Sequence, residues 1–520
     1  VALTTTDQAL TVTGTIDDDS AGDSALTLTT GTGSVDLQGD AGGTTALGAF
    51  TLASASQADL ADVTAASLAV TADNIDLNDA TYTATTGGVT FTGAVDLDAG
   101  AVTTTVDSSA GNGAIAFTST VDDAANDTAL SLDAGTGTVA MGGAIGGTGG
   151  IGAFTVSAAL QADLAAIEDA ATIAVTAGNI DLNAATYTAS SGPLTLAGDV
   201  DLDLSAGAVA LTTTDQALTV TGTIDDDSAG DSALTLTTGT GSVDLQGDAG
   251  GTTALGAFTL ASASQADLAD VTAASLAVTA DNIDLNDATY TATTGGVTFT
   301  GAVDLDAGAV TTTVDSSAGN GAIAFTSTVD DAANDTALSL DAGTGTVTMD
   351  GAIGGTDGIG TFTVSAASQA DLAAIEDAAT IAVTAGNIDL NAATYAASSG
   401  PLTLTGDVDL DLSAGTVALT TTDQALTVTG TIDDDSAGDS ALTLTTGTGS
   451  VDLQGDAGGT TALGAFTLAS ASQADLADVT AASLAVTADN IDLNDATYTA
   501  SSGPLTLTGD VDLDLSAGTV

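Results

Sequence analysis

The chain of 520 residues contains no Lys, Arg, His, Cys or Trp, and it has only three Pro. An average soluble protein of this length has about sixty basic residues, so their complete absence is not a chance fluctuation. Without basic side chains the chain cannot neutralise phosphates, and nucleic acids and anionic membrane surfaces are not expected partners. Without His or Cys, zinc, haem and iron–sulfur sites of the usual ligation are excluded, as are disulfides.

What the chain does contain is acid and apolar material. It has 69 acidic residues, nearly all of them Asp, with Glu168 and Glu376 as the only Glu. It is also 44% hydrophobic, with a mean hydropathy of +0.36, so it can form a core and is unlike an acidic disordered tail. No run of eighteen apolar residues occurs, so no transmembrane segment is expected. Neither an initiator Met nor a signal-peptide pattern stands at Val1. We therefore expect an excerpt of a longer protein, with targeting and anchoring segments elsewhere.

Internal repetition dominates the sequence. The opening VALTTTDQAL recurs at Val209 and Val417, and residues 1–139 are identical to residues 209–347. Each repeat consists of two similar halves, marked by one Tyr each and by Phe residues spaced by 104, such as Phe50 and Phe154. We predict three repeat units: 1–208 (halves 1–101 and 102–208), 209–416 (halves 209–309 and 310–416), and a partial hybrid unit, 417–520.

A shorter pattern lies inside each half. Segments such as ALTLTTGTGSVDLQGD (25–40) read as an alternating apolar strand, a Gly/Asn/Asp turn and a second short strand of the form apolar-Asp-apolar. Period-two alternation is typical of strands with one buried face. The segments recur about every twenty residues, which predicts an all-β fold, a parallel β-solenoid with one coil per segment. Only residues 56–67 and 161–171 have a helical look, and they fit either a short helix or an irregular coil edge.

An alternative architecture is a string of five Ig-like β-sandwich domains. The half-unit of about 104 residues has a suitable length for such a domain. The absence of Trp, the scarcity of Pro and interdomain linkers, and the short sub-repeat all favour the solenoid.

The segments GDAGGTTALGAFTLAS, AASLAVTADNIDLN and SSGPLTLTGDVDLDLSAG resemble the repeats of filamentous-haemagglutinin-like and other giant bacterial surface proteins. The likeness extends over essentially the whole chain and rests on low-complexity patterning. It implies a right-handed parallel β-helix and an exported filament or adhesin. Two departures are the lack of the family's secretion domain in this sequence and the complete loss of Lys and Arg.

Clusters of Asp in the expected corner loops are the strongest local feature. Several carboxylates and carbonyls on one loop suit a hard cation such as Ca²⁺, although the spacing matches no recognised calcium motif and a solvated turn reads the same way. The candidate Ca²⁺ ligands are Asp17, Asp18, Asp19, Asp23, Asp122, Asp123, Asn126, Asp127, Asp225, Asp226, Asp227, Asp231, Asp330, Asp331, Asn334, Asp335, Asp433, Asp434, Asp435 and Asp439.

A second acidic feature is the alternating DVDLD, which places three carboxylates on one strand face, as in Asp199, Asp201 and Asp203. Carboxylates about 5 Å apart repel by about 0.8 kcal/mol in water, and no basic partner exists anywhere in the chain. We therefore expect divalent cations to supply the missing positive charge.

These observations favour a structural role over catalysis. General-base His, Lys nucleophiles and Arg clamps are all missing, and a near-identical repeat would multiply any active site, so we expect no enzyme. The function we predict is the repeat region of an extracellular or cell-surface fibre, sheath or filament that self-associates as a homopolymer, laterally or end to end. The alternative is a passive adhesin stalk that projects a binding tip lying outside this sequence.

Overall fold

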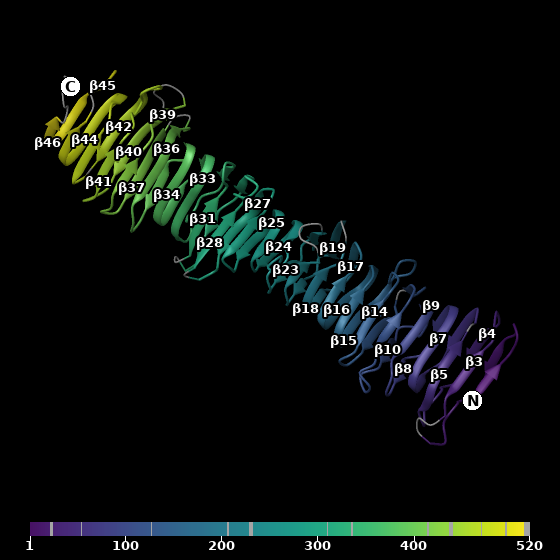
Figure 1. Ribbon diagram of the computed structural model, residues 1–520. Coiled ribbons are helices and arrows are strands. Elements are labelled where there is room, and N and C mark those ends of the chain that lie inside the picture. Colours follow the sequence, from purple (N-terminus) through teal and green to yellow (C-terminus); the bar gives the residue numbers. More distant parts are fainter. Residues whose placement is uncertain are drawn as a thin grey trace. The chain divides into compact units, whose positions relative to one another are not determined.

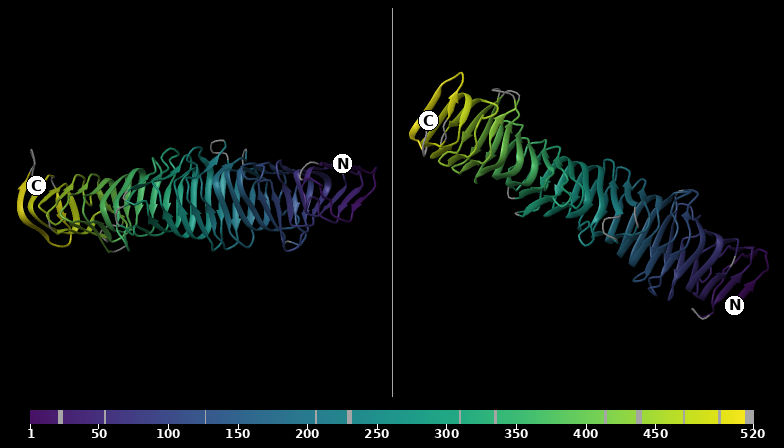
Figure 2. Two further views of the ribbon diagram at one scale, coloured as in Figure 1. Left: turned by 90° about the horizontal axis from the view of Figure 1, so that it is seen from below. Right: turned by 45° about the horizontal axis from the view of Figure 1, so that its top comes forward.

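The computed structural model describes residues 1–20, 24–53, 55–125, 127–204, 207–227, 232–308, 310–333, 336–412, 415–435, 440–469, 471–494 and 497–513. Within these residues all the regular secondary structure is β-strand, as predicted. The chain forms two compact units, Val1–Ser264 and Gln265–Val520. Each unit is a stack of coils whose strands lie side by side (Figures 1 and 2).

Most strands of the first unit are short, and the longer ones continue through a corner from one side of the coil to the next. They are β1 (Ala2–Thr4), β2 (Leu10–Val12), β3 (Leu26–Thr29), β4 (Ser34–Leu37), β5 (Leu47–Ala53), β6 (Gln57–Leu60), β7 (Val63–Leu77), β8 (Thr81–Ala84), β9 (Val89–Leu97), β10 (Thr103–Asp107), β11 (Ile115–Phe117), β12 (Val121–Asp122), β13 (Ala129–Asp133), β14 (Thr138–Met141), β15 (Ile151–Leu164), β16 (Ile167–Leu182), β17 (Thr186–Ala189), β18 (Leu194–Leu202), β19 (Gly207–Thr213), β20 (Leu218–Val220), β21 (Ile224–Asp226), β22 (Ser232–Thr237) and β23 (Ser242–Leu245).

Strand β24 (Leu255–Leu268) contains the boundary between the units. The second unit continues with β25 (Val271–Leu285), β26 (Thr289–Ala292), β27 (Val297–Leu305), β28 (Thr311–Asp315), β29 (Ile323–Phe325), β30 (Val329–Asp330), β31 (Ala337–Asp341), β32 (Thr346–Met349), β33 (Ile359–Leu372), β34 (Ile375–Leu390), β35 (Thr394–Ala397), β36 (Leu402–Leu410), β37 (Gly415–Thr421), β38 (Leu426–Val428), β39 (Ile432–Asp434), β40 (Ser440–Thr445), β41 (Ser450–Leu453), β42 (Leu463–Ala469), β43 (Gln473–Leu476), β44 (Val479–Leu493), β45 (Tyr498–Ala500) and β46 (Leu505–Leu513).

Each coil has three sides, and each side pairs in parallel with the same side of the next coil. In the first unit this gives three hydrogen-bonded ladders. Ladder A begins Leu26, Phe50, Leu68, Val89, Ile115 and Val139. Ladder B begins Leu10, Val35, Ala58, Ile75, Val95 and Val121. Ladder C begins Ile16, Ala41, Val63, Tyr82, Val106 and Leu132. These parallel ladders confirm the solenoid and exclude a string of antiparallel sandwiches.

The coils are unequal in length. The pairing of Phe50 with Leu68 closes a short coil, whereas the pairing of Val89 with Ile115 closes a much longer one. Ladder B takes eleven steps from Leu10 to Leu260, which gives an average coil of about 23 residues. This value is close to the predicted coil of roughly twenty residues, and the corner loops account for the additional residues.

The half-unit of the sequence does not correspond to a whole number of coils. Phe50 lies on ladder A, but its counterpart Phe154 in the next half-unit lies on ladder C. Tyr82 likewise lies on ladder C and Tyr187 on ladder B. Fourteen sides separate the two Phe residues, so one half-unit makes four and two-thirds coils. Each half-unit therefore presents a given side chain on a different side of the coil from the half-unit before it.

The second unit shows the same progression by itself. Its three Tyr residues, Tyr290, Tyr395 and Tyr498, lie on three different ladders. The three half-units that carry them thus present equivalent surfaces in three directions.

The core is formed by the inward-facing residue of each alternating pair. Leu, Val, Ile, Phe and Ala fill it, and most are almost completely buried. Tyr82 packs edge-on against Phe91, with ring centroids 6.1 Å apart, and Phe91 in turn packs against Phe117 at 5.0 Å. The hydroxyl of buried Tyr82 donates to the carbonyl of Leu60 at 2.8 Å, so its polar end is satisfied within the core.

One corner of the coil requires glycine. Gly93 joins two sides within β9 at φ +132°, and a Cβ there would lie 1.8 Å from the carbonyl oxygen of Ala72 on the preceding coil. Its counterparts Gly198, Gly301, Gly406 and Gly509 also have positive φ. A side chain at this corner would force neighbouring coils apart.

Neither segment with a helical pattern is a helix. Residues 56–67 form β6 and the start of β7, and residues 161–171 fall in β15 and β16. The reason is alternation in QADL: Ala58 and Leu60 point into the core while Asp59 points out. In the part of the chain that the structure describes, no helix is long and apolar enough to cross a membrane.

Candidate functional site: stacked carboxylate rows and an acidic groove

The middle Asp of each apolar-Asp-apolar strand stacks on the equivalent Asp of the next coil. We call these stacks the Asp rows. The first row consists of Asp36, Asp59, Asp76, Asp96 and Asp122, which lie in register. The later rows are Asp163, Asp181, Asp201 and Asp225; Asp267, Asp284, Asp304 and Asp330; Asp371, Asp389, Asp409 and Asp433; and Asp452, Asp475, Asp492 and Asp512.

Stacking brings like charges together. Parallel strands lie about 4.8 Å apart, and two carboxylates at that distance repel by about 1 kcal/mol even in water. The apolar residues on either side of each Asp must face the core, so the register that buries them also aligns the Asp. Burial of the core therefore imposes the electrostatic cost of the rows.

Side-chain amides partly relieve this repulsion. The Nε2 of Gln57 donates to Asp59 at 2.9 Å and to Asp76 at 2.5 Å, so one amide bridges two coils. Asn179 extends the next row in the same way, donating to Asp181 at 2.6 Å and Asp201 at 3.0 Å. The chain uses neutral donors where most proteins would use Lys or Arg.

The rows hold carboxyl groups with raised pKa values. Partial burial, followed by the hydrogen bond and charge of the neighbouring row carboxyl, raises the pKa of Asp76 to about 6. The same causes raise the pKa values of Asp181, Asp284 and Asp389 to about 6. Desolvation also raises the pKa of Asp96, whose buried Oδ1 has no hydrogen-bond partner among the described residues. A proton is thus held most readily in the middle of a row.

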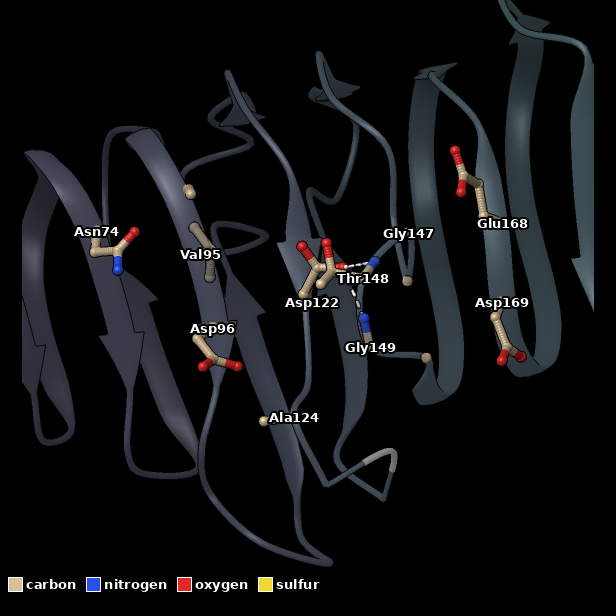
Figure 3. A pocket seen from close by; sticks show the side chains of 13 residues that line it. Asn74, Val95, Asp96, Asp122, Ala124, Gly147, Thr148, Gly149, Glu168 and Asp169 are labelled. Atoms are coloured by element: carbon tan, nitrogen blue, oxygen red, sulfur yellow. Dashed lines mark hydrogen bonds between the residues drawn. The ribbon is translucent and has the colours of Figure 1, made fainter.

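An acidic groove of about 790 Å³ lies beside the first row, where the first half-unit passes into the second (Figure 3). Asp96, Asp122, Glu168 and Asp169 contribute carboxylates to it, and a run of Gly residues forms part of its wall. The Asp122 carboxylate is already engaged, because it accepts the backbone N–H groups of Thr148 at 2.8 Å and Gly149 at 3.3 Å. Figure 3 shows Glu168 and Asp169 on the side of the groove away from Asp96.

The chemistry of this groove is limited to carboxylates and backbone groups. Such a lining attracts cations and can hydrogen-bond hydroxyl groups, but it offers neither a paired nucleophile and base nor a positive charge. In the second repeat Asp357 replaces Gly149, which adds a further carboxyl group at the equivalent place.

The structure separates the neighbouring Asp residues of the predicted loops. Alternation sends consecutive side chains to opposite faces of the strand. The first Asp of each cluster points outward and caps a loop of the next coil: Asp17 accepts the N–H groups of Thr44 and Thr45. Four first-Asp residues do the same in the other half-units, namely Asp122, Asp225, Asp330 and Asp433.

The second Asp of each cluster points inward. Asp123 is 2% exposed and accepts the N–H groups of Ala125, Asp127 and Thr128, at 2.9, 2.8 and 2.6 Å. Its equivalents hold their own loops in the same manner, namely Asp18 with Ser24, Asp226 with Ser232, Asp331 with Thr336 and Asp434 with Ser440. We call these five residues the capping Asp.

The remaining candidates do not converge with these. Asp19, Asp127, Asp227 and Asp435 are exposed. Asp23, Asn126, Asp231, Asn334, Asp335 and Asp439 lie outside the described residues. Within the described ranges, no group of three or more acidic side chains is arranged to hold a metal ion. The capping Asp instead accept hydrogen bonds from backbone N–H groups.

Sequence reasoning singled out the loops and DVDLD but missed the Asp rows. The signal was present, since VDL, ADL and IDL recur after each turn. Its meaning depends on register between coils of unequal length, which the strand pattern does not supply.

Comparison with family models, with characterised proteins and with solved structures finds no match to this chain. The functional argument therefore rests on the residues and geometry above.

Proposed function

We propose that this chain is the structural repeat region of an extracellular self-assembling fibre, sheath or surface filament, with divalent cations bridging its carboxylate surface. The resemblance of its repeats to giant bacterial surface proteins supports the location outside the cell.

One observation carries the structural role. Strand β19 runs through the junction between the first and second repeats, and β37 runs through the next junction. Both strands pair with the coils before and after them. At both junctions the repeats are thus joined by the same kind of parallel ladder that forms them.

The shift of one side per half-unit also suits a fibre. Equivalent side chains occupy three ladders within three half-units, as the Tyr residues of the second unit do. Such an array offers the same chemistry to neighbours in three directions, which favours bundles over flat ribbons.

The cation requirement follows from charge. Copies with a net charge of −69 and no basic residue repel each other, and at physiological salt screening extends over about 8 Å. Divalent cations neutralise two carboxylates each, so they can bridge row Asp residues on two copies, where monovalent salt only screens them.

Electron microscopy of the full chain tests this proposal. We expect bundled fibres in millimolar Ca²⁺ and their dispersal by chelator, whereas NaCl at the same ionic strength should not produce bundles. Single separate particles in both salts would overturn self-assembly.

Single separate particles in both salts would favour the alternative, a passive stalk that projects a tip lying elsewhere. The observation in its favour is the uniformly acidic surface, which keeps identical copies apart. A stalk should stay monomeric in Ca²⁺ by sedimentation, while a fibre should not.

A further inference from the structure

The same three-residue arrangement recurs in every half-unit. A Gln on one coil donates to the Asp two residues later and to the row Asp of the next coil. The five sets are Gln57 with Asp59 and Asp76, Gln161 with Asp163 and Asp181, Gln265 with Asp267 and Asp284, Gln369 with Asp371 and Asp389, and Gln473 with Asp475 and Asp492.

The bridge fixes how the two carboxyl groups meet. An amide NH₂ has two hydrogens, and here each carboxyl group receives one of them. Asp59 and Asp76 are then held on adjacent strands, and both hydrogens of the Gln57 amide are used. This amide has no third hydrogen for the other carboxyl oxygens. A proton shared between the two carboxyl groups satisfies both, as in other close carboxyl pairs.

The titratable groups that face these pairs are all acidic. Asp76 on β7 faces Asp59 on the preceding coil and Asp96 on β9. Asp284 on β25 faces Asp267 and Asp304, with Asp306 also near. Asp163 and Asp201 face Asp181, and Asp371 and Asp409 face Asp389. Because the chain has no basic residue, none of its side chains can take the place of the proton.

We propose that the Gln-bridged carboxyl pairs are proton-binding sites that stabilise the solenoid as the medium becomes mildly acidic. The sites recur in every half-unit, so proton uptake acts at several places in each of the two units.

The direction follows from linkage. The pKa values of Asp76, Asp181, Asp284 and Asp389 are raised from 3.8 to about 6, so the folded chain binds more protons than the unfolded chain between about pH 4 and 6. The stabilisation is complete below about pH 4, declines as the pH rises, and is lost above about pH 6.

An opposite contribution limits the range at the acid end. Backbone and hydroxyl donors of Thr32, Thr240 and Thr448 lower the pKa values of Asp7, Asp215 and Asp423. Those carboxylates stabilise the fold above about pH 4 and lose their contribution below it. The gain in stability from the bridged pairs should therefore level off near pH 4 and be opposed below it.

General charge repulsion would also make the fold more stable in acid, so the test needs a matched control. Asp76 and Asp73 lie three residues apart on β7, and Asp284 and Asp281 lie at the same places on β25; Asp73 and Asp281 are exposed. The double variant D76N/D284N and the control D73N/D281N remove the same charge from the same two strands of the full chain.

Potentiometric titration between pH 7 and 5 measures the proton uptake directly. Relative to wild type, we expect D76N/D284N to bind between one and two fewer protons and the control to show a smaller difference. The melting temperature of wild type and control should rise by several degrees over this range, and that of D76N/D284N by less. Equal changes in the two variants would assign the effect to general repulsion and overturn the proposal.

A measurement on wild type guards against misfolding of the variant. In carbon-13 Asp-labelled protein, the carboxyl signals of Asp76, Asp181, Asp284 and Asp389 should titrate with midpoints near pH 6. If no Asp signal titrates near pH 6, the proposal is overturned.

Discussion

The capping Asp of the corner loops and the Asp rows of the strand faces use one residue type in opposite ways. Buried Asp123 accepts three backbone N–H groups from its own loop. Asp76 faces two carboxyl groups and one shared amide. A buried carboxylate surrounded by donors stabilises its loop, whereas one stacked among carboxylates costs free energy until it is protonated. The number of local donors, not the Asp itself, decides the outcome.

Removal of a capping Asp should have the largest effect. Asp123→Ala leaves three N–H groups of a loop without their acceptor, and we expect a loss of about 3 kcal/mol in local stability. Hydrogen exchange of Thr128 and its neighbours measures it. Asp127→Ala, at an exposed position of the same loop, is the control. Equal protection in the two variants would contradict the capping role.

The Gln bridge should rank second. Gln57→Glu removes the donor shared by Asp59 and Asp76 and adds a third carboxylate, for an expected cost of about 2 kcal/mol at neutral pH. Gln38→Glu is the comparison, because among the described residues the Gln38 amide donates to Asp36 and to no carboxylate of a neighbouring coil. Exchange of the β6 and β7 amides should rise more in the first variant, and if both respond alike the bridge has no special role.

Neutralising a row Asp should stabilise the fold, whereas the two preceding substitutions should destabilise it. Asp76→Asn should stabilise the surrounding coils at pH 7.5, by up to about 1 kcal/mol, since solvent screens a side chain that is only partly buried. The gain should vanish near pH 4, where wild type already holds the proton. Urea-dependent exchange of β7 at the two pH values gives the measurement, and a gain that is independent of pH would count against the row interpretation.

The smallest effect is expected at an exposed corner. Asp7 has φ +57° and binds the N–H of Thr32 at 3.0 Å, while Asn112 has φ +53° and binds that of Thr136 at 2.9 Å. Asp7→Asn should thus change little at pH 7, while Asp7→Ala should weaken the corner. Exchange of the Thr32 amide separates them, and a marked loss in the Asn variant would mean that charge, not the hydrogen bond, holds this corner.

Much of this architecture could be predicted from local patterns. Alternation of apolar residues gives the strands and their buried faces, because period-two side chains point to opposite sides. It also identifies the outward Asp of DVDLD: Asp199 and Asp201 lie outside, and Val200 and Leu202 inside. The same reasoning failed at residues 56–67, where small residues concealed the alternation.

The sequence by itself determined the all-β class, the repeated half-unit and the absence of any internal counter-charge. Only the tertiary structure decided that a half-unit makes four and two-thirds coils, that equivalent surfaces therefore turn from side to side, and that the Asp align in rows. The physical reason is that strands are set by local alternation, whereas the register between coils depends on the length and corner geometry of every intervening loop. Carboxylates that are a whole coil apart in the sequence become neighbours only when those loops close.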